Sequence, residues 1–172
     1  MAGPGVTTRE GAQRIVGALE DAGVTLVCTV PDTWIGWLME AMRKSSRLRV
    51  VDVAREEEAI AVACGAGLVG ARAAVVIQNG GLLNCGAVAA SLVHLYALPC
   101  FLLVSYRGDE RDPVYYHAPK GRVTEATLAA WSIRYARAEG RERIAAQIRQ
   151  GFDWIAESRA PFALLFSAED LA

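Results

Sequence analysis

Three consecutive carboxylates, Glu56, Glu57 and Glu58, are the side chains best suited to chemistry in this 172-residue chain. A β-branched segment precedes them and a small apolar segment follows, which indicates a strand and then a helix. Acidic residues in a first helical turn each stabilise it by about 0.3–1 kcal/mol, which accounts for one or two of the three. Successive helical side chains point about 100° apart, so the three cannot share one environment. A desolvated carboxylate has a raised pKa and suits proton exchange, but this pattern leaves open which glutamate it is.

Several other catalytic patterns are absent from the sequence. It contains no GxGxxG or GxxxxGK[ST] phosphate motif and no serine between glycines after a strand. The segment QNGGLLN, residues 78–84, either makes a tight turn after a strand or presents backbone N–H groups to an anion. His94 and His117 stand alone and the four cysteines have no metal-ligand spacing, so we expect no metal site on this chain.

Composition restricts the classes of partner. The net charge of -1 gives no indication of nucleic acid or of an anionic membrane as a partner. The most apolar segment is interrupted by Asn84, Ser91 and His94, which predicts a buried helix rather than a membrane span. Cysteines within apolar segments and the lack of a secretory signal predict reduced thiols in a cytoplasmic protein. An apolar fraction of 53% is high for this size and suggests that a partner covers part of the surface.

Helical and strand patterns alternate along the chain. The strands are predicted over residues 24–30, 47–54, 72–78, 99–106, 133–139 and 161–167. Helices are predicted over residues 7–23, 33–45, 56–69, 123–132 and 141–159, and the first has its N-cap at Thr7 or Thr8. A single apolar helix is predicted after residues 79–81, and residues 107–122 are predicted to be irregular. Continuous apolar strands alternating with helices predict one α/β domain over 1–172, doubly wound, with about six parallel strands and helices on both faces. Ligands bind such sheets beyond the carboxyl ends of the strands, here residues 31–32, 54–56, 78–81 and 106–108.

Five segments resemble, in order and spacing, the pyrimidine-binding domain of thiamin-diphosphate-dependent decarboxylases. They are VPD, AREEEAIAVACGAGLVG, VVIQNGGLLN, SYRGD and HAPKGRVTEA, and the resemblance extends from about Arg9 to Ser167. The most similar branch of the family acts on sulfopyruvate and phosphonopyruvate. The resemblance therefore implies a carboxy-lyase for a small 2-oxo acid with an anionic tail, and thiamin diphosphate with Mg²⁺ as cofactors.

The resemblance also assigns residues to the cofactor. A glutamate at the start of this helix hydrogen-bonds the aminopyrimidine ring and protonates its ring nitrogen in the family, which implies Glu56, or Glu57 if the alignment shifts by one. The loop that lies near the pyrimidine and the substrate corresponds to Asn79, Gly80, Gly81 and Asn84. Relatives read Asn-Ser-Gly-Leu-Gly-Asn there, so Gly80 and Leu83 are departures, and the missing hydroxyl leaves the substrate open.

Further residues are implied for catalysis and substrate binding. Asp32 matches an active-site acid, the alternative being a turn residue at a strand end. His117 matches a loop histidine with a role in proton transfer or product release, the alternative being no role. Arg107, Lys120 and Arg122 could receive a sulfonate or phosphonate, with surface charge as the alternative for each. The implied catalytic residues are thus Glu56, His117 and Asp32, and Asn79 joins the substrate contacts.

The family holds the diphosphate through a metal on a second domain marked by Gly-Asp-Gly, and this sequence has no such motif. The resemblance therefore implies a separate diphosphate-binding β subunit that carries the Mg²⁺ site, in an α2β2 or larger assembly with the active site at the interface. The chain alone is expected to be inactive. Two alternatives stay open: a carboligating, acetolactate-synthase-like subunit, and a non-catalytic assembly subunit of the same fold.

Overall fold

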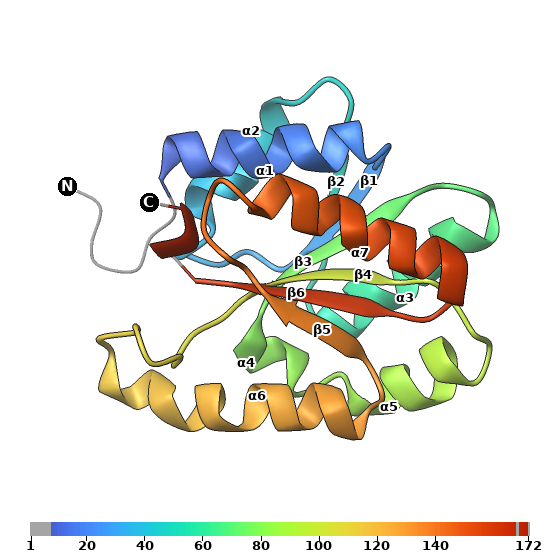
Figure 1. The fold of residues 1–172 in the computed structure, drawn as a ribbon. Coiled ribbons are helices and arrows are strands. Elements are labelled where there is room, and N and C mark those ends of the chain that lie inside the picture. Colours follow the sequence, from blue (N-terminus) through green and yellow to red (C-terminus); the bar gives the residue numbers. More distant parts are fainter. Residues whose placement is uncertain (1–7, 168, 172) are drawn as a thin grey trace.

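Six short strands form one parallel sheet. The computed structural model describes residues 8–167 and 169–171. The strands are β1 (Leu26–Thr29), β2 (Arg49–Asp52), β3 (Ala73–Gln78), β4 (Phe101–Ser105), β5 (Arg134–Arg137) and β6 (Phe162–Phe166). They pair in the order β2-β1-β3-β4-β6-β5, and every pair is parallel (Figure 1). The prediction of an α/β fold with about six parallel strands is confirmed.

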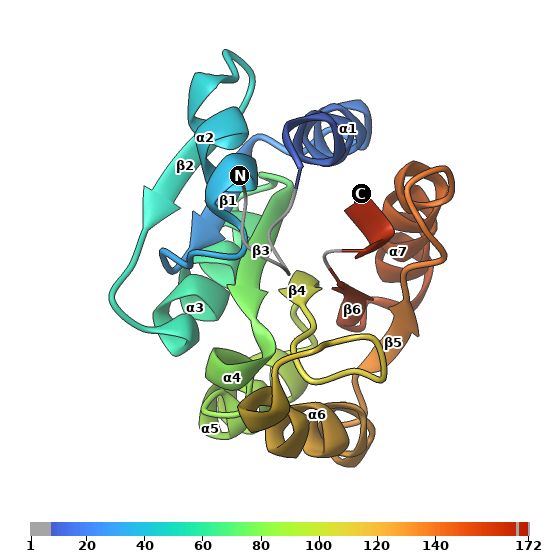
Figure 2. The ribbon, with the colours of Figure 1, turned by 90° about the vertical axis from the view of Figure 1, so that its left-hand side faces the viewer.

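Helices cover both faces of this sheet (Figure 2). One layer holds α1 (Arg9–Asp21), α2 (Gly36–Lys44) and α7 (Ile144–Ser158). The other holds α3 (Glu56–Leu68), α4 (Asn79–Leu82), α5 (Gly86–Val88), the π-helix η1 (Ala89–His94) and α6 (Ala118–Ala130). Short 3₁₀ turns, η2 (Tyr115–His117) and η3 (Glu169–Leu171), complete the elements. Along β3, Ala74 and Val76 enter the first core, whereas Val75 and Ile77 enter the second, because successive strand side chains point to opposite faces. This alternation explains why the central strands β1, β3, β4 and β6 are nearly continuous apolar runs, whereas the edge strands β2 and β5 begin and end with exposed charged residues.

The start of α1 follows the capping pattern in the sequence. The side-chain oxygen of Thr8 accepts a hydrogen bond from the backbone N–H of Gly11 at 3.0 Å, so Thr8 is the N-cap. Thr7, the other candidate cap, lies outside the described residues. In the described part of the chain, no helix has the length and apolarity needed to cross a membrane. The four cysteines are free and buried.

Two sequence-based predictions of helices were wrong. The segment after β3 is divided into α4, α5 and η1 rather than forming one helix, and α4 begins at Asn79 itself, within the expected turn. Two glycines in α4 weaken helix propensity there, and the wider turn of η1 interrupts the regular hydrogen bonding.

The second error concerns α6, which begins at Ala118 rather than at residue 123. Pro119 fits the first turn of a helix, where no N–H donor is needed. Gly121 is also part of α6. Only glycine fits at this position, because a Cβ at Gly121 would lie 1.7 Å from the carbonyl oxygen of Gly108. As a result Lys120 and Arg122 lie on a helix and not in the irregular segment.

Candidate active site

Glu56 lies at the carboxyl edge of the sheet, as the first residue of α3 and close to α4. A Cβ at Gly81 would lie 1.7 Å from Oε1 of Glu56, so the carboxylate occupies the space that any side chain at position 81 would need. The Glu56 side chain is partly buried, and it makes no hydrogen bond or ion pair with residues 8–167 or 169–171. Its carboxylate oxygens are therefore free to accept a hydrogen bond from a ligand at this edge.

The other two glutamates have local partners. Oε2 of Glu58 accepts hydrogen bonds from the backbone N–H groups of Ala54 at 3.0 Å and Arg55 at 3.3 Å, which caps α3. Glu57 forms an ion pair with Arg55 at 2.7 Å, and that hydrogen bond lowers the pKa of Glu57. The structure thus gives the three carboxylates three environments, and only Glu56 lacks a partner among the described residues.

A neutral thiol lies beside these carboxylates. Burial, with the negative charges of Glu57 and Glu56 as smaller contributions, raises the pKa of Cys85 to about 12. Its Sγ lies 3.5 Å from the carbonyl oxygen of Gly81 and donates to it. The thiol stays protonated at neutral pH and is not a nucleophile.

Asp32 and Arg107 form a buried ion pair between the ends of β1 and β4. Their side chains are only 6% and 11% exposed, and the guanidinium of Arg107 lies 4.8 Å from the ring centroid of Trp34. Oδ2 of Asp32 and Nε of Arg107 are buried without a hydrogen bond to any described residue. The two charges therefore compensate each other, and each side chain keeps one buried polar atom without a hydrogen bond.

Asn79 joins the loop after β4 to α6. Its side-chain Nδ2 donates to the carbonyl of Arg107 at 2.8 Å and to Oγ1 of Thr124 at 2.9 Å, and its Oδ1 accepts from the backbone N–H of Arg107 at 3.2 Å. Asn79 is fully buried. Both ends of its carboxamide are thus used inside the protein, where they fix the position of Arg107.

His117 is buried at the N-terminus of α6 and is oriented by Asp112. Its Nδ1 lies 2.8 Å from Oδ2 of Asp112, and its ring packs edge-on against Trp34 at 5.3 Å and Tyr116 at 4.7 Å. Burial raises the pKa of Asp112, but hydrogen bonds from two backbone N–H groups and from His117 outweigh it, so the net shift is downward. An ionised Asp112 needs a donor, so Nδ1 carries the proton and Nε2 is left for exchange with a ligand.

Asp112 was missed by the sequence reasoning. It lies in an irregular segment crowded with charges, where its residue type alone does not distinguish it from Asp109 or Glu110. Its position five residues before the histidine was the one available signal.

The remaining predicted residues separate into two groups. Lys120 lies over Gly80: a Cβ at Gly80 would lie 3.3 Å from Cδ of Lys120. The same Cβ would lie 3.2 Å from Oε1 of Gln78. Glycine at position 80 therefore leaves room for the lysine at this edge. Arg122 is exposed and lines a separate hollow with Tyr106, and Asn84 is also exposed.

The structure thus brings most of the predicted site residues to one edge of the sheet. A first cluster follows α3 and α4, where Glu56 lies against Gly81 and Lys120 lies against Gly80. A second cluster consists of Asn79, Arg107, Asp32 and His117: Asn79 is hydrogen-bonded to Arg107, Arg107 is paired with Asp32, and Trp34 packs against both Arg107 and His117. Within residues 8–167 and 169–171 there is no group of three or more side chains that could hold a metal ion.

Comparison with known proteins identifies the class of this domain. Residues 9–111 match the family described as thiamine pyrophosphate enzyme, N-terminal TPP binding domain. Sulfopyruvate decarboxylase subunit alpha of Methanothermobacter thermautotrophicus is 33% identical over 139 residues, which are 78% of this chain and 84% of that protein. The chain therefore belongs to the thiamine pyrophosphate enzymes, in the family of sulfopyruvate decarboxylase alpha subunits.

Other relatives agree with this membership. Sulfopyruvate decarboxylase subunit alpha of Methanocaldococcus jannaschii is 29% identical over 158 residues, 92% of this chain and 94% of that one. Phosphonopyruvate decarboxylase of Streptomyces viridochromogenes is 34% identical over 129 residues, 72% of this chain and 32% of that one. The 2-oxoglutarate:ferredoxin oxidoreductase of Magnetococcus marinus has the same fold, with a TM-score of 0.72 and 15% identity over 94% of this chain and 29% of its own. The predicted resemblance to the sulfopyruvate and phosphonopyruvate decarboxylases is confirmed, whereas the roles of single residues stay predictions.

Proposed function

We propose that this chain is the pyrimidine-binding subunit of a heteromeric thiamin-diphosphate-dependent decarboxylase. Its substrate is a small 2-oxo acid with an anionic tail, sulfopyruvate or phosphonopyruvate. The observation that carries the proposal is the partly buried, unpartnered carboxylate of Glu56, which lies against the side-chain-free surface of Gly81 at the carboxyl edge.

The residues at this edge fit the pyrimidine end of the cofactor. Glu56 offers an acceptor that makes no ion pair with a described cation, and Gly81 leaves the carboxylate room. When bound, thiamin diphosphate supplies the electron sink for the loss of CO₂ from a 2-oxo acid. Glu56 shares a proton between its carboxylate and a ring nitrogen of the pyrimidine, and this hydrogen bond orients the ring.

Lys120 and the second cluster together receive the substrate. The ammonium of Lys120, which has no ion-pair partner in the described residues, binds the sulfonate or phosphonate. His117 exchanges a proton with the substrate through Nε2, because Asp112 holds Nδ1. Asp32 and Arg107 are also proposed substrate contacts, because Trp34 packs against both Arg107 and His117 and so places the ion pair beside the histidine.

A second subunit completes the site. Exposed apolar side chains lie on and after α3, at Val62 (40% exposed), Leu68 (71%) and Val69 (84%), and Leu95 and Tyr96 are exposed after η1. Covering this apolar surface favours association with a diphosphate-binding β subunit that holds Mg²⁺. We propose an α2β2 or larger assembly in the cytoplasm, where the buried cysteines stay reduced.

The test uses Glu56→Gln in the complex with the diphosphate-binding subunit, with Glu57→Gln as the matched control. CO₂ release from sulfopyruvate and from phosphonopyruvate is measured, and assembly is followed by gel filtration. Loss of the proton-carrying group is expected to lower turnover by about 100-fold or more with assembly intact, while Glu57→Gln stays near wild type.

Three results would contradict the proposal. Loss of turnover in Glu57→Gln alone would move the role to the next glutamate. A wild-type complex that assembles without decarboxylating either acid would favour the assembly-subunit alternative. Formation of acetolactate from pyruvate by the wild-type complex would favour carboligation.

A further inference from the structure

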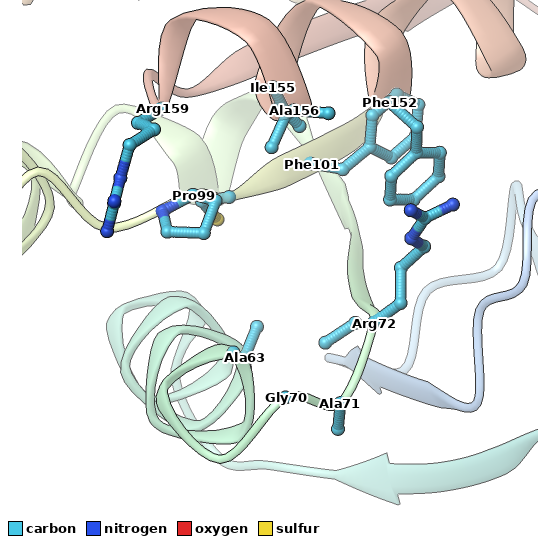
Figure 3. Close-up of a pocket in the computed structure, with 13 residues that line it drawn as sticks. Ala63, Gly70, Ala71, Arg72, Pro99, Phe101, Phe152, Ile155, Ala156 and Arg159 are labelled. Atoms are coloured by element: carbon cyan, nitrogen blue, oxygen red, sulfur yellow. The ribbon is translucent and has the colours of Figure 1, made fainter.

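A cavity of about 380 Å³ lies at the amino edge of the sheet, opposite the candidate active site. It opens where β3 and β4 begin, between the C-terminal half of α3 and the end of α7 (Figure 3). The apolar part of its lining includes Ala63, Pro99, Phe101, Phe152 and Ile155. A cavity of this volume is within the range of small-molecule sites.

Small residues keep this cavity open. Gly67, Gly70, Ala71 and Ala156 line it without filling it. A Cβ at Gly67 would lie 3.8 Å from Cγ of Pro99, an ordinary contact, so the backbone would tolerate a side chain there. The cavity is therefore open because the residue at position 67 has no side chain, and a larger residue there could fill it.

Two guanidinium groups give the cavity a positive charge. Arg72 and Arg159 line it, and none of the described lining residues is acidic. Arg72 donates to the carbonyl of Ala22 and lies 5.5 Å from the ring centroid of Phe152, which fixes its side chain. The side chain of Arg159 makes no hydrogen bond or ion pair with residues 8–167 or 169–171. Figure 3 shows the two arginines on opposite sides of the cavity.

The position of Arg159 adds to this argument. It follows the last turn of α7 with a φ of 54°, a left-handed conformation that glycine usually occupies at a helix end. An arginine at this point keeps a cation at the mouth of the cavity, where it is available to an anion.

We propose that this cavity binds a small organic anion with an apolar body, such as an aryl carboxylate or sulfonate. The aromatic and aliphatic lining takes the body, Arg159 hydrogen-bonds the charged group, and Arg72 on the opposite side adds positive charge to the cavity. The site lies at the edge opposite Glu56, so its ligand does not occupy the candidate active site. The proposal does not depend on the function proposed above.

Binding is tested with 1-naphthalenesulfonate as the probe, titrated into the ¹⁵N-labelled full-length chain. Saturable amide shifts are expected at Gly67, Gly70 and Arg159. Arg159→Gln is expected to weaken binding about fivefold or more, because a charge-assisted hydrogen bond is lost. Arg149→Gln, at an exposed arginine on α7, is the matched control and is expected to stay within about twofold of wild type.

A second variant tests the cavity itself. Gly67→Leu places a side chain toward Pro99 and is expected to abolish binding, whereas Gly65→Ala, with open space around its Cβ, leaves it unchanged. The proposal is overturned if the shifts do not saturate, if they lie at the carboxyl edge, or if Gly67→Leu still binds. Equal binding of neutral 1-naphthol, or an equal loss in Arg149→Gln, would also contradict it.

Discussion

Gly81→Ala is the sharpest perturbation that the site offers, because it displaces Glu56 without changing its chemistry. The new Cβ would lie 1.7 Å from Oε1 and 1.9 Å from Cδ of Glu56. Ordinary contacts need about 3.5 Å, so the carboxylate has to move by about 2 Å. The obstacle is the end of a flexible side chain, and alanine is favoured over glycine in a helix by about 0.5–1 kcal/mol. The free energy of unfolding should therefore stay within about 1 kcal/mol of wild type.

Turnover should respond quite differently. A hydrogen bond to a charged group contributes about 1.5–3 kcal/mol, so losing its geometry predicts a fall in turnover of about 10- to 100-fold. The assay is decarboxylation by the complex with the diphosphate-binding subunit, with thermal unfolding of the variant chain alongside. Gly17→Ala on α1 is the control, because nothing lies within 4 Å of its added Cβ. Equal turnover in the two variants would refute the role given to the position of Glu56.

Two further predictions concern the second cluster. Asp112→Asn removes the ionised acceptor of His117 and should lower turnover at least about tenfold with an altered pH profile. Because the pKa of Asp112 is lower in the folded chain, its stabilising effect is complete above the ordinary pKa of 3.8 and is lost as the pH falls through the folded-state value. Wild type and Asp112→Asn should therefore converge in unfolding free energy in strong acid; a constant difference would contradict this. Arg107→Met should destabilise the fold by about 3–5 kcal/mol in urea unfolding, since Asp32 is left buried without a counter-charge, and Asp32→Leu in the same chain should restore most of it. A double variant as unstable as the single one would rule out that cause.

Much of the fold could be predicted because its signals are local. The four central strands are apolar runs long enough to be recognised, the edge strands lie within longer β-favouring segments, and Thr8 supplies a cap that the pattern already contains. The start of α6 could not be predicted, because Gly121 in a helix reads as a break. The glycine at position 121 is required by the close approach of Gly108, and this contact exists only in the folded chain.

The candidate site was predictable as a location more than as a set of contacts. Strand ends gather at one edge of a parallel sheet, which brought Asp32, Glu56 and Asn79 together in the prediction. The ion pair of Asp32 with Arg107 joins residues 75 positions apart, and residue type does not reveal it. For the same reason the sequence suggested that Arg107 is free to receive an anion, whereas in the structure it is paired with the buried Asp32.

The most direct test of the account is calorimetric titration of thiamin diphosphate with Mg²⁺. It is made on this chain alone and on the chain co-expressed with its diphosphate-binding subunit. We expect tight binding by the complex and none by the isolated chain, because the described residues include no group that could hold the metal ion. Tight binding by the isolated chain would contradict the division of the site between two subunits, and no binding in either sample would contradict the enzymatic function itself.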